Sequence, residues 1–126
     1  MGTRCLTFVY DGDVPVINVY RQFDGYPSCH GHELAQFLNS KTLVNGYSDK
    51  NSAQANGMGC LAAQLIVQLK HGVGGIYIYP VASTDCFQDY EYHVYENKVV
   101  VKNPTEVIFS GTWREFNEFC SAEELA

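Results

Sequence analysis

The sequence has few basic residues and no long apolar run, and each shortage excludes a class of protein. Eight lysines and arginines face fourteen aspartates and glutamates, which gives a net charge of −6. General nucleic-acid binding needs a basic surface that displaces counterions, so we expect no nucleic-acid partner. No segment approaches the roughly 18 apolar residues of a membrane helix, so we expect no membrane partner.

The sequence also lacks the patterns of a secreted, zinc-binding or common hydrolytic protein. Its five cysteines include no CxxC pair, and its first residues do not resemble a secretion signal. We therefore expect reduced thiols and a cytoplasmic protein, in the host cytoplasm if the gene is viral. There is no HExxH, no GxSxG and no structural zinc spacing, so we expect no cofactor, metal or catalytic residue.

What is present predicts one globular domain over residues 1–126. Hydrophobic residues make up 46% of the chain and charged residues 17%. Alternating and helical patterns predict a β-β-α-α-β-β-β-β-α order, which is typical of an α+β fold with a mostly antiparallel sheet of five or six strands and three helices. The expected strands are 3–10, 15–23, 74–81, a hairpin over 89–103 and 106–111, and the expected helices are 30–39, 58–71 and 112–120.

Four local features extend this prediction. The strand at 74–81 is apolar on both sides, so we expect it to be central in the sheet. Residues 40–57 are polar without a period, and we expect a long loop there. Ser28 is the expected N-cap of the first helix, and Thr112 with Glu115 forms a capping box for the last.

The start of the chain resembles a group of small bacteriophage and bacterial proteins. The shared pattern is an N-terminal GTR, a strand hairpin and a DGYP turn, followed by a glycine that opens a helix. Here these features are residues 2–4, residues 24–27 and Gly31, and the FSGTWREF segment near the end is similar as well. The resemblance implies an origin in a phage or a phage-rich genome. It implies no activity and no catalytic residue.

The densest chemistry lies in RQFDGYPSCHGHELAQFL, residues 21–38. Arg21 shares a strand face with apolar residues, so a buried guanidinium there needs a partner, and Asp24 is the nearest candidate. Arg4 lies in the neighbouring strand. The two arginines could form a fork for a phosphate or carboxylate, or Arg21 and Asp24 could form a structural pair that holds the DGYP turn.

A ligand hypothesis follows from the first alternative. Arg4 and Arg21 would hold a phosphate, the turn and its tyrosines a base, and the loop before Gly59 would close over it, since glycines before a helix expose N–H groups to an anion. The predicted ligand-binding residues are Arg4, Tyr20, Arg21, Asp24, Tyr26, His30, His32, Asn56, Gly57 and Gly59.

Cys29, His30 and His32 suggest two further hypotheses. A thiol at a helix start beside a histidine has the minimum chemistry of a nucleophile. The same three residues, joined by His71 or His93, could supply metal ligands. For both, solvated polar residues at a helix start are the simpler interpretation.

The sequence therefore favours a non-enzymatic small binding protein of phage origin that sequesters a phosphate-bearing molecule such as a host signalling nucleotide. The alternatives are a module that binds a host protein and a small Cys/His-dependent hydrolase. The tyrosine-rich strand at 74–81 and the tyrosines at 90 and 92 could stack on a base, but they are more typical of a covered sheet surface. With the high apolar content, they predict a homo-oligomer.

Overall fold

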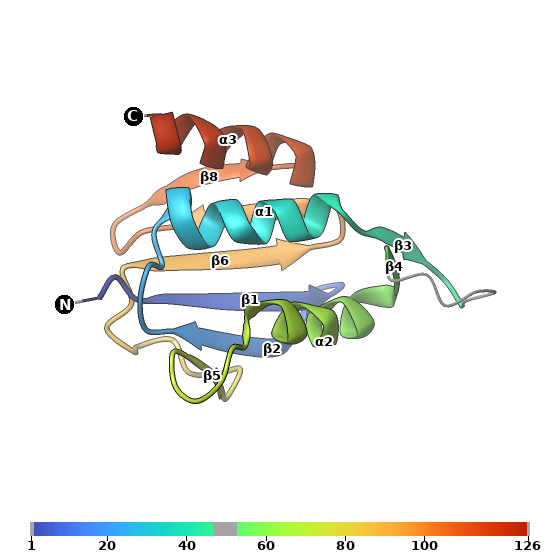
Figure 1. Ribbon diagram of the computed structural model, residues 1–126, viewed down its shortest axis with the longest axis horizontal. Coiled ribbons are helices and arrows are strands. Elements are labelled where there is room, and N and C mark those ends of the chain that lie inside the picture. The colour runs from blue at the N-terminus through green and yellow to red at the C-terminus, as the bar shows by residue number, and fades with distance from the viewer. Residues whose placement is uncertain (1, 47–52, 126) are drawn as a thin grey trace.

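The computed structural model describes residues 2–46 and 53–125 and confirms the α+β class. Three helices lie against one face of a mostly antiparallel six-stranded sheet, and a two-stranded sheet extends from one end (Figure 1). The elements are β1 (Cys5–Asp11), β2 (Val14–Arg21), η1 (Pro27–Gly31), α1 (His32–Asn39), β3 (Thr42–Val44), β4 (Gln54–Asn56), α2 (Gly57–Leu69), β5 (Ile76–Tyr79), β6 (Tyr90–Tyr95), β7 (Lys98–Lys102), β8 (Val107–Gly111) and α3 (Trp113–Leu125).

The large sheet has the strand order β5-β2-β1-β6-β7-β8. β1 pairs parallel with β6, and the other neighbours pair antiparallel. The β6–β7 hairpin turns at Glu96 and Asn97, and Asn97 has a left-handed φ of 52°.

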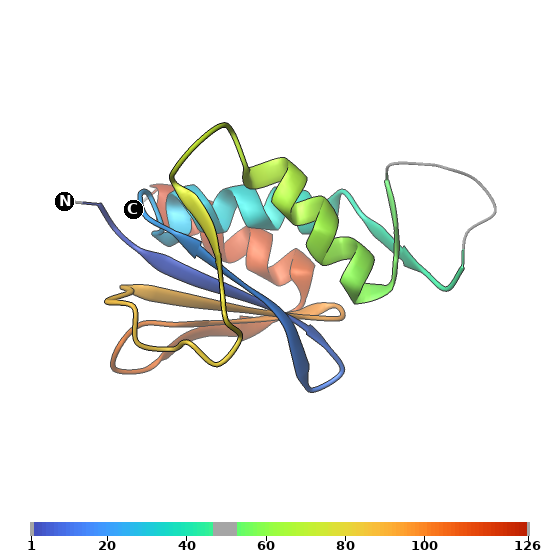
Figure 2. The same ribbon diagram turned by 90° about the horizontal axis from the view of Figure 1, so that it is seen from below.

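Alternation along the strands gives the sheet two different faces. Cys5 and Val9 of β1 and Tyr92 and Val94 of β6 are buried beneath the helices with Phe116 of α3. The opposite face, which we call the open face, bears Leu6, Phe8 and Tyr20 in a second small cluster. The connection from β5 to β6 crosses this open face beneath β2 and β1 (Figure 2).

Two predictions about the strands are wrong. β5 lies at the edge of the sheet and not at its centre, and its apolar residues Tyr77 and Ile78 are accordingly 44% and 58% exposed. The expected loop at 40–57 contains β3 and β4, which pair parallel to each other. The part of that loop over 47–52 lies outside the described residues.

The start of the first helix also differs from the prediction. A π-helical turn, η1, precedes α1, and Ser28 lies inside it instead of capping it. Tyr26 occupies the cap position without a side-chain hydrogen bond, and its carbonyl accepts from Cys29 N at 3.0 Å; Pro27 follows it at the first helical position, where no N–H group is needed. At α3 the capping box is confirmed: Thr112 N donates to Glu115 Oε1 at 2.8 Å, and Glu115 N donates to Thr112 Oγ1 at 3.1 Å.

Candidate functional site

Arg21, in the segment 21–38 that carries the densest chemistry, is fixed by three acceptors. Arg21 Nη1 lies 2.8 Å from Glu33 Oε1 and 3.2 Å from His30 Nδ1, and Arg21 Nε donates to the carbonyl of Phe23 at 2.9 Å. The ion pair therefore joins Arg21 to Glu33 of α1 and not to Asp24, the expected partner. Asp24 contributes its backbone instead: its carbonyl accepts from His30 N at 3.0 Å, and its φ is 62°.

These contacts determine the state of His30. An arginine only donates, so Nδ1 of His30 accepts and Nε2 carries the proton, which it donates to Thr7 Oγ1 at 2.8 Å. His30 is fully buried, and burial followed by the charge of Arg21 lowers its pKa to about 3. The imidazole is thus a neutral brace between η1, β1 and β2.

The DGYP turn packs tightly against β1. Gly25 N donates to Thr3 O at 2.9 Å, and the Tyr92 hydroxyl donates to Gly25 O at 2.8 Å. A Cβ at Gly25 would lie 2.9 Å from both Cβ and N of Cys5, so only glycine fits. Arg21, His30 and this turn together form a structural junction.

The predicted ligand-binding residues are not brought together. Arg21, Asp24, Tyr26, His30 and His32 lie around the junction, where β1 begins. Arg4 is nearby, and its backbone bonds to Asp89.

Other members of the predicted set lie elsewhere. Asn56 and Gly57 line a separate cavity with Asp11, at the opposite end of β1, and Gly59 follows them in α2. Tyr20 is on the open face, stacked on Tyr79 with ring centroids 4.8 Å apart.

Cys29 does not have the electrostatics of an activated thiol. Burial and then the charge of Asp24 raise its pKa, and the opposing effect of Arg21 is smaller. Within residues 2–46 and 53–125, no three His, Cys, Asp or Glu side chains are grouped so that they could hold a metal ion.

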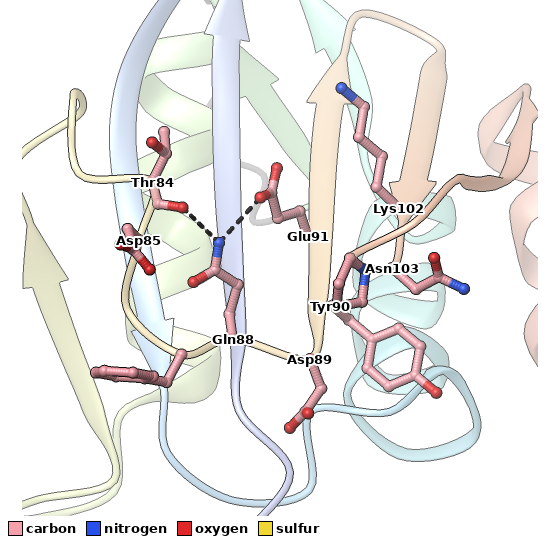
Figure 3. A pocket seen from close by; sticks show the side chains of 10 residues that line it. Thr84, Asp85, Gln88, Asp89, Tyr90, Glu91, Lys102 and Asn103 are labelled. Carbon is pink, nitrogen blue, oxygen red and sulfur yellow. Dashed lines mark hydrogen bonds between the residues drawn. The ribbon is translucent and has the colours of Figure 1, made fainter.

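A different site lies on the open face, in a pocket of about 280 Å³ that we call the loop pocket (Figure 3). The β5–β6 connection forms one wall, and the ends of β6 and β7 form the other. The lining residues are Thr84, Asp85, Phe87, Gln88, Asp89, Tyr90, Glu91, Lys102, Asn103 and Pro104.

Gln88 holds the connection in place. Its Oε1 accepts from Cys86 N at 2.8 Å, and its Nε2 donates to Thr84 O at 2.7 Å and to Glu91 Oε2 at 3.0 Å (Figure 3). The side chain thus closes the tight turn and attaches it to β6. All its strong hydrogen-bonding groups are used, so Gln88 shapes the pocket wall and has no donor left for a ligand.

The turn presents Phe87 to solvent. Phe87 has a φ of 57°, and 84% of its surface is exposed. A bulky residue in the left-handed region is strained, and an almost fully exposed aromatic ring gains nothing from burial. Strain of this kind is concentrated at ligand-binding positions, so Phe87 is a candidate contact residue.

Three polar groups of the pocket are available to a ligand. Within the described residues, the Asp85 carboxylate and the Lys102 ammonium form no hydrogen bond or ion pair. Asn103 accepts from Thr105 and Glu106 through Oδ1, which leaves its two amide N–H groups. The pocket therefore offers an acceptor, a cation and an amide donor beside an exposed ring.

Glu91 connects the pocket to a hydrogen-bonded chain on the open face. A carboxylate only accepts, so His93 Nε2 donates to Glu91 Oε1 at 2.9 Å, and the Tyr10 hydroxyl donates to His93 Nδ1 at 2.6 Å. The His93 ring stacks on Phe8 at 4.9 Å.

Apart from the Glu91 carboxylate, the two titratable members of this hydrogen-bonded chain, His93 and Tyr10, stay neutral. Burial lowers the pKa of His93 and raises that of Tyr10, and the neighbouring Tyr95 raises the latter further. The chain thus orients Glu91 on the pocket wall and does not activate a nucleophile.

Sequence reasoning missed the loop pocket. Its residues come from the DCFQDYE segment and from Lys102 and Asn103, which the sequence places on opposite sides of a hairpin. The usable signal is local: a lone phenylalanine stands among polar residues in a connection where no strand or helix pattern buries it. The backbone strain at Phe87 has no sequence signature.

Comparisons with protein families, curated proteins and solved structures find no match to this chain. No helix among the described residues is long and apolar enough to span a bilayer.

Proposed function

We propose that this protein is a non-enzymatic binding protein that holds a small polar molecule in the loop pocket. The observation that supports this best is Phe87, an exposed ring on strained backbone at a pocket whose remaining walls bear unpaired polar groups. Ligand sites commonly combine an apolar contact surface with a few polar groups that fix orientation. The loop pocket supplies the apolar contact through Phe87, and most of its other lining residues are polar.

The charges of the pocket favour a neutral ligand rich in hydroxyl groups. Asp85, Asp89 and Glu91 supply three carboxylates against the single ammonium of Lys102. A phosphate would be repelled by this excess of negative charge. Hydroxyl groups can donate to the carboxylates and accept from Lys102 and Asn103, so a neutral sugar satisfies both kinds of group.

Phe87 adds the apolar half of sugar recognition. The face of an aromatic ring is electronegative, and the C–H groups on one face of a pyranose are weakly electropositive. Stacking a sugar on the exposed ring therefore buries apolar area without burying a charge. The expected ligand class is a neutral monosaccharide or one terminal unit of a longer glycan.

Saturation-transfer difference NMR tests this function. The probes are D-glucose, D-galactose, D-mannose, N-acetyl-D-glucosamine, lactose and cellobiose. We expect a signal from at least one of them, and binding about tenfold weaker in Phe87→Ala, which corresponds to ~1.4 kcal/mol. Val73→Ala is the matched control, because Val73 is also fully exposed and lies outside the pocket. Equal binding by the two variants would remove Phe87 from the site.

A second candidate function is binding of the phosphate-bearing ligand that the sequence favours, at a cavity other than the loop pocket. A cavity of about 200 Å³, which we call the Arg21 pocket, lies beside Arg21, Asp24, His71 and the Gly74–Gly75 backbone. Three of the five guanidinium N–H groups of Arg21 are used, and the two on Nη2 form no hydrogen bond within the described residues. Nucleotides and inorganic phosphate in the same screen test this candidate, with His71→Ala as the variant.

A further inference from the structure

Within the part of the chain that the structure describes, the edge of the sheet at β5 has one residue whose backbone forms no hydrogen bond. Gln22 N donates to Gly75 O, so backbone groups of Gly75 point toward β2. The direction of the backbone N–H and C=O groups alternates from residue to residue along a strand. The backbone groups of Tyr77 and Tyr79 therefore also point toward β2, and those of Ile76 and Ile78 point away from it. The free edge therefore presents the backbone of Ile76 and Ile78.

The outward-pointing backbone groups on either side of Ile78, those of Ile76 and Pro80, already have hydrogen-bond partners. Ile76 N donates to Gly74 O at 2.9 Å, and Ile76 O accepts from Lys70 Nζ at 2.8 Å. Pro80 has no N–H group, and its carbonyl accepts from Asn18 Nδ2 at 3.0 Å. Among residues 2–46 and 53–125, this leaves the N–H and C=O of Ile78 without a hydrogen-bond partner, and Ile78 is 58% exposed. An exposed edge with an apolar side chain is a template for strand pairing.

The charge distribution of the chain indicates which partner can pair with the β5 edge. From residue 51 to residue 84 the sequence has no acidic residue, although the whole chain has a net charge of −6. Val67, Val73 and Val81 of this segment are exposed as well. Two copies of the chain repel each other over the rest of their surface. In this segment only Lys70 is charged, and its ammonium is held by Ile76 O, so like-charge repulsion at this edge is small.

We propose that two copies of this protein form a homodimer by antiparallel pairing of their β5 strands, with Ile78 opposite Ile78 on a two-fold axis. A pair of opposed residues in an antiparallel ladder can exchange both hydrogen bonds, so the pairing satisfies the two free groups of each copy. In this register Ile76 faces the partner's Pro80. The carbonyls of these two residues need no hydrogen bond from the partner, because Lys70 already donates to Ile76 O and Asn18 already donates to Pro80 O.

Sedimentation velocity across a concentration series tests the dimer. Ile78→Lys places two like charges together on the axis, so we expect it to be monomeric where the wild type is dimeric. Val107→Lys adds the same charge at an exposed site on β8, the opposite edge of the sheet, and should leave the dimer intact. Both sites are exposed, and equal melting temperatures would show that folding is unaffected. A monomeric wild type, or a dimer that Ile78→Lys does not weaken, would overturn the proposal.

Isotope-filtered NOE spectroscopy on a mixture of labelled and unlabelled protein tests the register. With Ile78 opposite Ile78, Tyr77 lies opposite the partner's Tyr79 in a non-hydrogen-bonded pair, where Cα atoms approach to about 4.5 Å. We expect an intermolecular contact between the Hα protons of these two residues. A dimer without this contact uses another surface or register and would contradict the proposal.

Discussion

The Nε2 atom of Gln88 lies 3.0 Å from Glu91 Oε2 and so ties the β5–β6 connection to the edge of the loop pocket. Replacing Gln88 by alanine removes this bond and the two bonds that close the turn. Net contributions of about 1 kcal/mol per hydrogen bond, reduced by solvent access, predict a loss of ~1–2 kcal/mol in the free energy of unfolding. Urea denaturation measures the loss, and faster amide exchange at Cys86 should accompany it. Unchanged exchange would show that the turn is held by other contacts.

Because Arg21 pairs with Glu33, we expect substitution of Glu33 to destabilise the protein more than substitution of Asp24. Glu33→Gln leaves the partly buried guanidinium without its counter-charge, and we expect a loss of about 1–2 kcal/mol in the free energy of unfolding. Asp24→Asn should have little effect, since asparagine tolerates the φ of 62° and keeps the backbone carbonyl that His30 uses. If Asp24→Asn proves the more damaging change in chemical denaturation, Asp24 and not Glu33 balances Arg21.

We expect the free energy of unfolding to fall at acid pH, because His30 is buried in its neutral form. Its pKa is about 3 in the folded protein and ~6.5 in an unfolded chain, so below that pH the unfolded state binds a proton that the folded state does not. The free energy of unfolding is thus at its full value above about pH 6.5. It falls toward pH 3 by up to ~1.4 kcal/mol per unit, and His93 contributes in the same direction. Urea midpoints at about pH 7, 6 and 5 measure this fall. An NMR titration showing His30 protonated near pH 6.5 would contradict it.

Two glycines should respond to alanine in opposite ways. Gly25→Ala drives a Cβ to 2.9 Å from the backbone and side chain of Cys5, which neither strand nor turn can relieve cheaply, so we expect marked destabilisation. In α2, a Cβ at Gly59 would meet no atom of the described residues within 4 Å, so the higher helix propensity of alanine should stabilise the Gly59→Ala protein by ~0.5–1 kcal/mol. Thermal melts of the two variants measure the contrast. A stable Gly25→Ala protein would show that the DGYP turn can move away from β1.

Periodicity in the sequence predicts most of the elements, because strand alternation and helical spacing report directly on burial. It places β5 wrongly because apolar residues on both sides of a short strand indicate a covered strand, whereas Ile78 remains exposed at a sheet edge. It also misses β3 and β4, whose three residues each are too short to show a period.

The site is less predictable than the fold, because it depends on contacts between distant segments. The sequence identifies Arg21 as needing a partner but chooses Asp24 by proximity along the chain, and the helical turn brings Glu33 closer. Lys102 reaches the loop pocket only because β7 pairs with β6. The left-handed backbone of Phe87 follows from the turn that Gln88 closes, and no local residue pattern encodes it.

The most direct test of the central claim is a set of ¹H–¹⁵N correlation spectra of the protein, recorded with the neutral sugars that give a saturation-transfer signal and then with nucleotides. The account predicts sugar-dependent shifts concentrated at residues 84–91 and at Lys102 and Asn103, with the surroundings of Arg21 unchanged. Spectra in which no sugar moves these resonances would contradict it. If nucleotides shift His71 and Gly75 in those spectra, the ligand site is the Arg21 pocket.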